Sequence, residues 1–236
     1  MQHPFTKFTD KRRLICLYNS ETVEIISHHH EHAMVTGVSH PVPLRELTVR
    51  NSKLNAFITT YDDRQVFPYR PVPADYNNIK DIAYSLARIN RYNGTYHGRE
   101  SYSVAQHSVY VSWLVPQEYR LAAILHDAPE KILNDLPSPL KHDLQEYLDL
   151  EKLHEKAVCE AWNLTVPLSH PAIKEADRSV LYWEAIAMKP GMVKFLEPPK
   201  GKALAIPVMT ATEAENFFLQ EFSKIKKDIH ETSNLR

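Results

Sequence analysis

From about residue 79 onward, apolar side chains recur every three or four positions, with polar side chains between them. This spacing is typical of amphipathic helices that bury one face in a shared core. The segments that show it are 79–92, 103–114, 117–133, 140–162, 171–188 and 210–230. The pattern therefore predicts a mainly α fold in which these helices form one bundle.

The first 62 residues follow a different pattern. Short β-prone runs, RLICLY and TVEIIS, precede the polar run HHHEH, which we interpret as a solvated loop. Three prolines within residues 66–78 then mark a boundary, because proline interrupts helices and sheets. We predict an N-terminal extension of unknown role over residues 1–62, strand-containing or α+β, and a helical domain over residues 66–230.

Composition argues against several classes of function. The 28 basic and 29 acidic residues give a net charge of -1 without a long basic run, so nucleic acid is not an expected partner. No window approaches 18 consecutive apolar residues and the N-terminus lacks a signal-peptide core, so we expect a cytoplasmic protein without a membrane partner. Cys16 and Cys159 are the two cysteines and lie far apart, which leaves histidine and carboxylate as ligands for any metal.

Four ionisable residues lie on or at the end of apolar helical stripes, where an isolated charge would lose its hydration without compensation. They are His107, His126, Asp127 and Asp177. Two imidazoles and two carboxylates suit a divalent ion and leave coordination positions open for water or substrate. Pro129 should end or kink the helix near His126, which would let His126 and Asp127 face one cavity. We therefore predict a metal site, with Co, Mn, Zn, Ni, Fe and Mg all open as its occupant.

Three more polar residues follow the His-Asp pair. Glu130 lies four residues after His126, so on a continuing turn it shares that residue's face and can reach a metal-bound water as a general acid or base. Asp135, in a predicted turn, is a candidate to hold a second ion or the attacking water. Lys141 follows two prolines that restrict the backbone, which would keep its ammonium near the site as a charge for a phosphate. Taken singly, all three are also explained as solvated surface residues.

These residues resemble the signature of the HD-domain phosphohydrolases, which is a histidine, a later His-Asp pair and a final aspartate. The blocks DIAYSLARINRYNG, YSVAQHSV, AAILHDAPE, DLPSPLK and KEADRSVLYWEA look like successive blocks of the branch that contains 5'-deoxynucleotidases and phage dATP triphosphohydrolases. The similarity covers about residues 66–190. It implies an HD-domain helical bundle that holds its metal at His107, His126, Asp127 and Asp177. Near members often read NGHT where this chain has NGTYHGRE, and Gln106 stands where an acidic residue is often found.

The same resemblance implies an activity and a substrate pocket. Residues matching Glu130 and Asp135 support catalysis or a second metal ion, and the residue matching Lys141 contacts phosphate. The residues expected at the substrate pocket are Arg91, Ile89 and Pro139. We expect a metal-dependent deoxynucleoside triphosphate triphosphohydrolase, specifically a phage nucleotide-pool enzyme that converts dATP to deoxyadenosine and triphosphate. Its expected partners are the nucleotide substrate and further copies of the chain in a homo-oligomer.

Three other functions compete with this one. A 5'-deoxynucleotidase acting on monophosphates would use the same ligands with a smaller phosphate site. A nucleotide-binding regulatory module would keep the metal without turnover, although intact Glu130 and Asp135 argue against it. A di-iron oxygenase would require more histidine ligands than the helical region supplies, since His142 and His154 lie on a polar-looking segment that predicts exposure.

Overall fold

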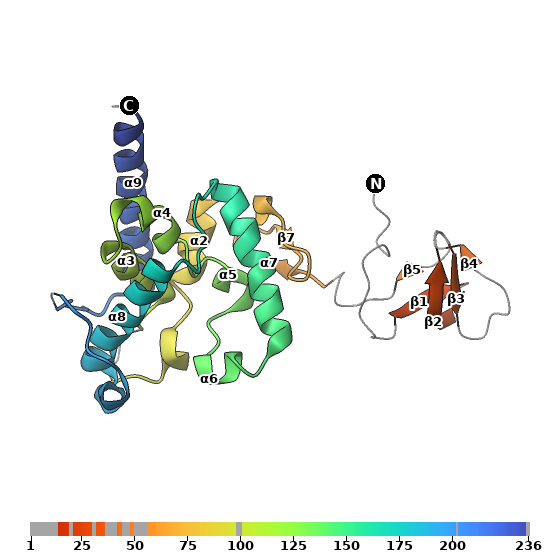
Figure 1. Cartoon of the computed structure of the whole chain (residues 1–236), viewed down its shortest axis with the longest axis horizontal. Coiled ribbons are helices and arrows are strands. Elements are labelled where there is room, and N and C mark those ends of the chain that lie inside the picture. Colours follow the sequence, from red (N-terminus) through yellow and green to blue (C-terminus); the bar gives the residue numbers. More distant parts are fainter. Residues whose placement is uncertain are drawn as a thin grey trace. The chain divides into compact units, whose positions relative to one another are not determined.

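The computed structural model describes the strands between Leu14 and Val49, and then residues 56–97, 101–201 and 203–234. Figure 1 shows the chain, which divides into two compact units, Met1–Ala56 and Phe57–Arg236. The first unit contains an antiparallel sheet, and the second is mainly helical.

The sheet of the first unit has five strands in the order β4-β3-β2-β1-β5. They are β1 (Leu14–Tyr18), β2 (Glu21–His29), β3 (His32–Val35), β4 (Val42–Pro43) and β5 (Thr48–Val49). β1 and β2 pair with Cys16 opposite Val23, so the runs RLICLY and TVEIIS form adjacent strands, as their β-branched composition favours. This agrees with the expectation of a strand-containing extension.

The HHHEH run is not a loop throughout. His28 and His29 end β2, and His32 begins β3, with His29 opposite His32 in the register. His30 and Glu31, between these strands, lie outside the described residues.

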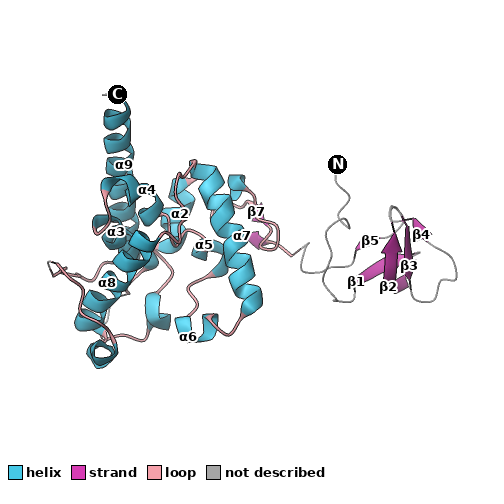
Figure 2. Ribbon diagram, in the orientation of Figure 1, coloured by secondary structure: helices cyan, strands magenta, loops and turns pink. Residues whose placement is uncertain are grey.

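The second unit begins with a hairpin of β6 (Ile58–Thr59) and β7 (Gln65–Val66). Its helices, cyan in Figure 2, are α2 (Ile79–Leu86), α3 (Val104–Trp113), α4 (Arg120–Ile124), α5 (Glu130–Leu133), α6 (Ser138–Lys141), α7 (Gln145–Trp162), α8 (Pro171–Met188) and α9 (Ala211–Asn234). Short 3-10 segments are η2 (Pro73–Asp75), before α2, and then η3 (Arg91–Gly94), η4 (Gln117–Tyr119) and η5 (Pro190–Phe195), between later helices. The prediction of a mainly helical fold is confirmed.

Helix α3 contacts α4, α8 and α9, which surround it in Figure 1. Every residue from 104 to 112 is buried, including the apolar Val104, Val109 and Val111. A helix enclosed on all sides places its polar side chains in the interior as well as its apolar ones. His107 is therefore held inside the helical unit.

Helix α2 is shorter than its apolar spacing predicts. The side chain of Asn78 caps its first turn by accepting from the backbone N–H groups of Lys80 and Asp81, but the helix ends at Leu86. The chain then turns at Ala87 and is extended at Asn90, and the carbonyl of Ile89 accepts from the N–H of Val104 at 3.0 Å. The expectation of a helix running through Ile89 is therefore wrong, because pairing with the segment before α3 replaces the last helical turns.

The chain does break where Pro129 predicts it. Helix α4 ends at Ile124, and α5 begins only at Glu130. His126 and Asp127 lie in the intervening turns, where the N–H of Ala128 donates to the carbonyl of Leu125 at 2.9 Å. This departure from helical geometry is what allows two consecutive side chains to approach one point.

A buried ion-pair cluster ties the β6–β7 hairpin to the helices. Arg64, between the two strands, donates to Oδ2 of Asp81 on α2 at 3.0 Å, and Lys131 on α5 binds the same oxygen. The side chains of Asp81 and Lys131 are each 1% exposed. Since the hairpin contributes a partner to a buried carboxylate of α2, it belongs to the helical unit.

His154 on α7 is buried, which corrects the prediction of an exposed residue. Its Nε2 donates to the carbonyl of Pro68 at 2.7 Å, and its Nδ1 accepts from the hydroxyl of Tyr76. The polar sequence around it misled the prediction, because a segment far away along the chain covers this part of α7.

Candidate metal centre and its pocket

Two histidines approach each other at the break after α4. His107 projects from the buried helix α3, His126 lies in the turn, and their ring centroids are 5.3 Å apart. The Nδ1 of His126 donates to the carbonyl of Ala123 at 2.8 Å, and the Nδ1 of His107 lies 2.6 Å from Oε1 of Glu184. With both Nδ1 atoms engaged by oxygen acceptors, the Nε2 atoms are the free nitrogens.

Carboxylates lie beside both Nε2 atoms. Oδ2 of Asp127 is 3.1 Å from Nε2 of His126 and 3.7 Å from Nε2 of His107. Oδ1 of Asp177, from α8, is 3.0 Å from Nε2 of His107. The ligand atoms of His107, His126 and Asp127 all lie within 4.8 Å of one another, so this group could hold a metal ion. Asp177 adjoins the group on its His107 side.

The unpaired atoms support this assignment. Neither buried Nε2 atom makes a hydrogen bond of good geometry, although carboxylate oxygens lie 3.0 Å from that of His107 and 3.1 Å from that of His126. Buried polar atoms in folded proteins are nearly always satisfied. Metal-binding histidines usually donate their other ring N–H to a carboxylate or a backbone carbonyl, which fixes the tautomer. The ring of His107 contacts the carboxylate of Glu184 in this way, and the ring of His126 contacts the backbone carbonyl of Ala123. The residues present therefore fit a divalent ion with mixed nitrogen and oxygen ligands.

The charges around the metal group determine whether its ligands are protonated before a metal ion binds. Burial and Arg91 lower the pKa of His107, but Glu184 and Asp177 outweigh them and raise it to about 9. Burial raises the pKa of Asp127, but His126 and His107 hold it well below its usual range. An ion binding near neutral pH must therefore displace a proton from His107.

Glu184 is the residue of this site that sequence reasoning missed. It is fully buried on α8, and its carboxylate accepts from Tyr92 at 2.6 Å and from Tyr102 at 2.8 Å as well as from His107. Burial opposes its charge, but Arg91 and His107 hold its pKa at about 2. A signal was present, since Glu184 lies seven residues after Asp177 and so shares its helical face.

Arg91 connects the buried carboxylate to the metal group. Its Nε lies 3.2 Å from Oε2 of Glu184, and its Nη1 lies 3.9 Å from Oδ2 of Asp127. Its side chain is only 13% exposed. The guanidinium balances charge beside the metal group and reaches the adjacent pocket.

A pocket of about 570 Å³ opens beside the metal group. The predicted residues that line it are Arg91, Asp127, Glu130, Asp135, Pro139, Lys141 and Asp177. Ile89 does not line it and packs against the hydrophobic core instead. Tyr92, Asn93, Thr95 and Lys189 also line the pocket and were not assigned to it from the sequence. The pocket therefore brings together acidic, basic and amide groups from segments far apart in the chain.

Glu130 begins α5 at the pocket wall and is only 7% exposed. Burial and the neighbouring charges of Asp127 and Asp135 raise its pKa well above the usual range, which favours the neutral acid. Its Oε2 is buried without a hydrogen-bond partner. Glu130 is therefore a carboxyl group able to donate a proton into the pocket.

Asp135, between α5 and α6, and Lys141, the last residue of α6, both line the pocket. Burial raises the pKa of Asp135. The ammonium of Lys141 binds Glu151 on α7, and although burial lowers its pKa, this partner raises it above the usual value. Lys141 is thus charged, but it already has a carboxylate partner.

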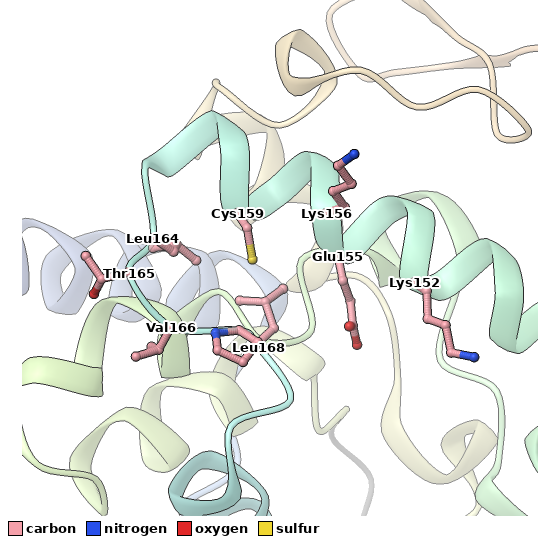
Figure 3. A pocket seen from close by; sticks show the side chains of 9 residues that line it. Lys152, Glu155, Lys156, Cys159, Leu164, Thr165, Val166 and Leu168 are labelled. Carbon is pink, nitrogen blue, oxygen red and sulfur yellow. The ribbon is translucent and has the colours of Figure 1, made fainter.

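A second, shallower pocket of about 370 Å³ lies against the C-terminal half of α7 (Figure 3). In Figure 3 the thiol of Cys159 points toward Leu168 in the loop that follows the helix. Burial raises the pKa of this thiol, so it is a poor nucleophile. Glu155 is the one carboxylate among the residues that line this second pocket, whereas Asp127, Glu130, Asp135 and Asp177 all line the first.

No helix in the described part of the chain is long and apolar enough to cross a membrane.

Comparison with known proteins finds relatives but no matching family model. Over 129 residues the chain is 40% identical to the uncharacterized protein YfdR of Escherichia coli (strain K12), a match that covers 55% of this chain and 70% of that protein. Over 118 residues it is 40% identical to an uncharacterized protein of Rhodobacter capsulatus, which covers 45% of this chain and 60% of that protein.

Proposed function

Since the chain belongs to the family of the uncharacterized Escherichia coli protein YfdR, we propose its function from the chemistry of its own site. The protein is a metal-dependent phosphohydrolase of the HD-domain type that cleaves deoxynucleoside triphosphates to a deoxynucleoside and triphosphate. dATP is the first substrate to test, as for a phage enzyme that controls nucleotide pools. The observation that carries this proposal is that the buried Nε2 atoms of His107 and His126 lie close to the carboxylate of Asp127. Asp127 in turn lines a pocket that is also lined by cationic side chains.

His107, His126 and Asp127 would hold the ion, with Asp177 beside His107 as a fourth ligand. A divalent ion held there would supply Lewis-acid chemistry, lowering the pKa of a bound water and polarising a phosphoryl oxygen. Glu184 and the carbonyl of Ala123 orient the two imidazoles through their Nδ1 atoms, so that both Nε2 atoms point to one place. This prior orientation reduces the rearrangement that metal binding requires.

Glu130 acts in the proton transfers. Its buried carboxyl group favours the protonated form, which suits it to protonate the oxygen that leaves with the deoxynucleoside. It then recovers a proton from the incoming water. Asp135, on the same pocket wall, orients the water or holds a second ion.

Cationic groups stabilise the phosphates. Arg91 lies between the metal group and the pocket, and Lys141 faces it from the segment after α5. Charge on the transferred phosphoryl group shifts during cleavage, and fixed cations stabilise that shift without reorganising. Binding a polyphosphate at Lys141 requires its ammonium to share or exchange its contact with Glu151.

A 5'-deoxynucleotidase is the second candidate, and one contact favours it. Because Lys141 is paired with Glu151, less free positive charge is available on that wall for β- and γ-phosphates. A monophosphate would need only the metal group and Arg91. A regulatory module without turnover is disfavoured, since Glu130 lies buried and unpaired at the pocket wall, where a binding module has no need of it.

One experiment separates these candidates. The full chain is incubated with a panel of dNTPs and dNMPs in the presence of Mn²⁺, Co²⁺ or Mg²⁺, and the products are identified by phosphorus NMR. The proposal predicts triphosphate from dNTPs only when metal is present. Orthophosphate from dNMPs alone would support the nucleotidase, and binding without any product would support the regulatory module.

A further inference from the structure

Lys189 lines the same pocket as Asp127 and Asp177 of the metal group. The pocket is lined by Asp177 and Leu181 on α8 and by Lys189 just beyond its C-terminal end. An α-helix rises about 1.5 Å per residue, so the backbones of Asp177 and Lys189 are separated by about 18 Å along α8. One ligand can therefore touch the metal group and Lys189 only if the long side chain of Lys189 reaches back along the pocket toward Asp177.

Two contacts fix the part of the pocket around Lys189. The ammonium of Lys189 donates to Oγ1 of Thr95 at 3.3 Å, and the N–H of His97 donates to the carbonyl of Met188 at 2.9 Å. Thr95 follows a turn in which Tyr92 and Asn93 have positive φ angles of 56° and 51°. Because such angles are costly for residues other than glycine, the surrounding contacts must hold this turn in place.

Lys189 differs from the other pocket cations in its partner. Arg91 is paired with Glu184, and Lys141 is paired with Glu151. Within the described part of the chain, the ammonium of Lys189 binds a hydroxyl and no carboxylate. An incoming anion meets no competing carboxylate at Lys189, so this lysine can add a charge-assisted contact at little cost.

We infer that Lys189, supported by Thr95, is an anion subsite that takes the terminal phosphate of a polyphosphate whose reacting phosphate lies at the metal group. The inference rests on the proposed function for the identity of the ligand, but the subsite itself is defined by the pocket. It makes Lys189 the residue that favours a triphosphate over a monophosphate. Lys141 then contacts the middle of the phosphate chain from the opposite wall.

The test measures binding without turnover. Inorganic tripolyphosphate and orthophosphate are titrated calorimetrically into the full chain at a fixed free Mg²⁺ concentration, for the wild type, Lys189→Met and Lys189→Arg. Lys189→Met should weaken tripolyphosphate binding about tenfold, as expected for the loss of one charge-assisted contact, and should change orthophosphate binding less than twofold. Lys189→Arg should retain most of the affinity, because it keeps the charge.

Lys194→Met is the matched control, since Lys194 is exposed on η5, contacts the ring of Phe195 and does not line the pocket. Unchanged tripolyphosphate affinity in Lys189→Met, or equal losses in Lys189→Met and Lys194→Met, would overturn the subsite. So would a loss of orthophosphate affinity equal to the loss for tripolyphosphate. If Lys189 proves necessary for tripolyphosphate binding while no dNTP is hydrolysed, the subsite stands and the proposed activity fails. If dATP is hydrolysed equally well by Lys189→Met, the activity stands and the subsite fails.

Discussion

Nδ1 of His107 lies 2.6 Å from Oε1 of Glu184, and both side chains are fully buried. The carboxylate fixes the orientation of the ring, so that its opposite nitrogen faces Asp127 and Asp177. Such a contact would influence metal binding indirectly, because the carboxylate sets the orientation of the imidazole ring and the basicity of its Nε2 atom.

Glu184→Gln should weaken metal binding by about ten- to a hundredfold, as expected for loss of a carboxylate that orients a histidine ligand. The measurement is a titration of the purified variant with Mn²⁺ or Co²⁺. Glu175→Gln, on the exposed face of the same helix, is the control and should bind metal as the wild type does. Equal metal affinity in Glu184→Gln and the wild type would show that this carboxylate has no role at the metal group.

Glu130→Gln should separate chemistry from binding. Removing the proton donor should lower kcat by about a hundredfold or more while KM and metal content change little, because general acid catalysis contributes that order of rate. Steady-state kinetics with dATP and metal analysis of the same sample provide both readings. Turnover equal to that of the wild type would remove Glu130 from the mechanism.

Lys141→Ala should reduce kcat/KM for dATP by about ten- to a hundredfold, which corresponds to roughly 1.5 to 3 kcal/mol for a charge-assisted contact. It should slow any hydrolysis of dAMP much less. Lys152→Ala is a suitable control, because that lysine is on the adjacent helix and its side chain is 69% exposed. Equal effects on dATP and dAMP would place Lys141 at the reacting phosphate instead of the distal ones.

His154 should make the folded state sensitive to acid. Burial lowers its pKa in the folded protein, while in the unfolded chain it titrates near the ordinary value of 6.5. The unfolded state therefore binds the proton first, so this stability is fully present above about pH 6.5 and is lost as the pH falls below that value. Urea unfolding at several pH values between 5 and 8 measures the dependence.

His154→Gln should show a flatter dependence of unfolding free energy on pH than the wild type, even though losing the contacts with Pro68 and Tyr76 lowers its stability throughout. His142→Gln, at an exposed position, serves as the control. An unchanged slope in His154→Gln would mean that this histidine does not contribute to acid sensitivity.

The sequence predicts structural features that depend on neighbouring residues, and it misses features that depend on contacts between residues distant along the chain. Apolar periodicity locates the helices, and Pro129 locates the break after α4, because both effects are local. The end of α2 was missed because it depends on pairing between Asn90 and Ser103, and the burial of His154 was missed because it depends on Pro68. These partners are distant along the chain.

The same distinction applies to the site. His107 and Asp177 are noticeable in the sequence because each interrupts an apolar stripe, and His126 with Asp127 because the two are adjacent. Glu184 was overlooked because a glutamate in a helix is ordinarily exposed, and only the fold shows three hydroxyl and imidazole donors directed at it. Lys189 was overlooked because only the fold places the end of α8 beside the turn after η3.

The most direct test of the central claim follows the oxygen atom of the attacking water. The full chain with Mn²⁺ is incubated with dATP in oxygen-18 water, and the products are separated and examined by mass spectrometry and phosphorus NMR. Attack at the α-phosphate predicts label in triphosphate and unlabelled deoxyadenosine, with both products absent in His126→Ala, which lacks a metal ligand. Formation of dADP and orthophosphate, or turnover of dAMP alone, would contradict the triphosphohydrolase assignment.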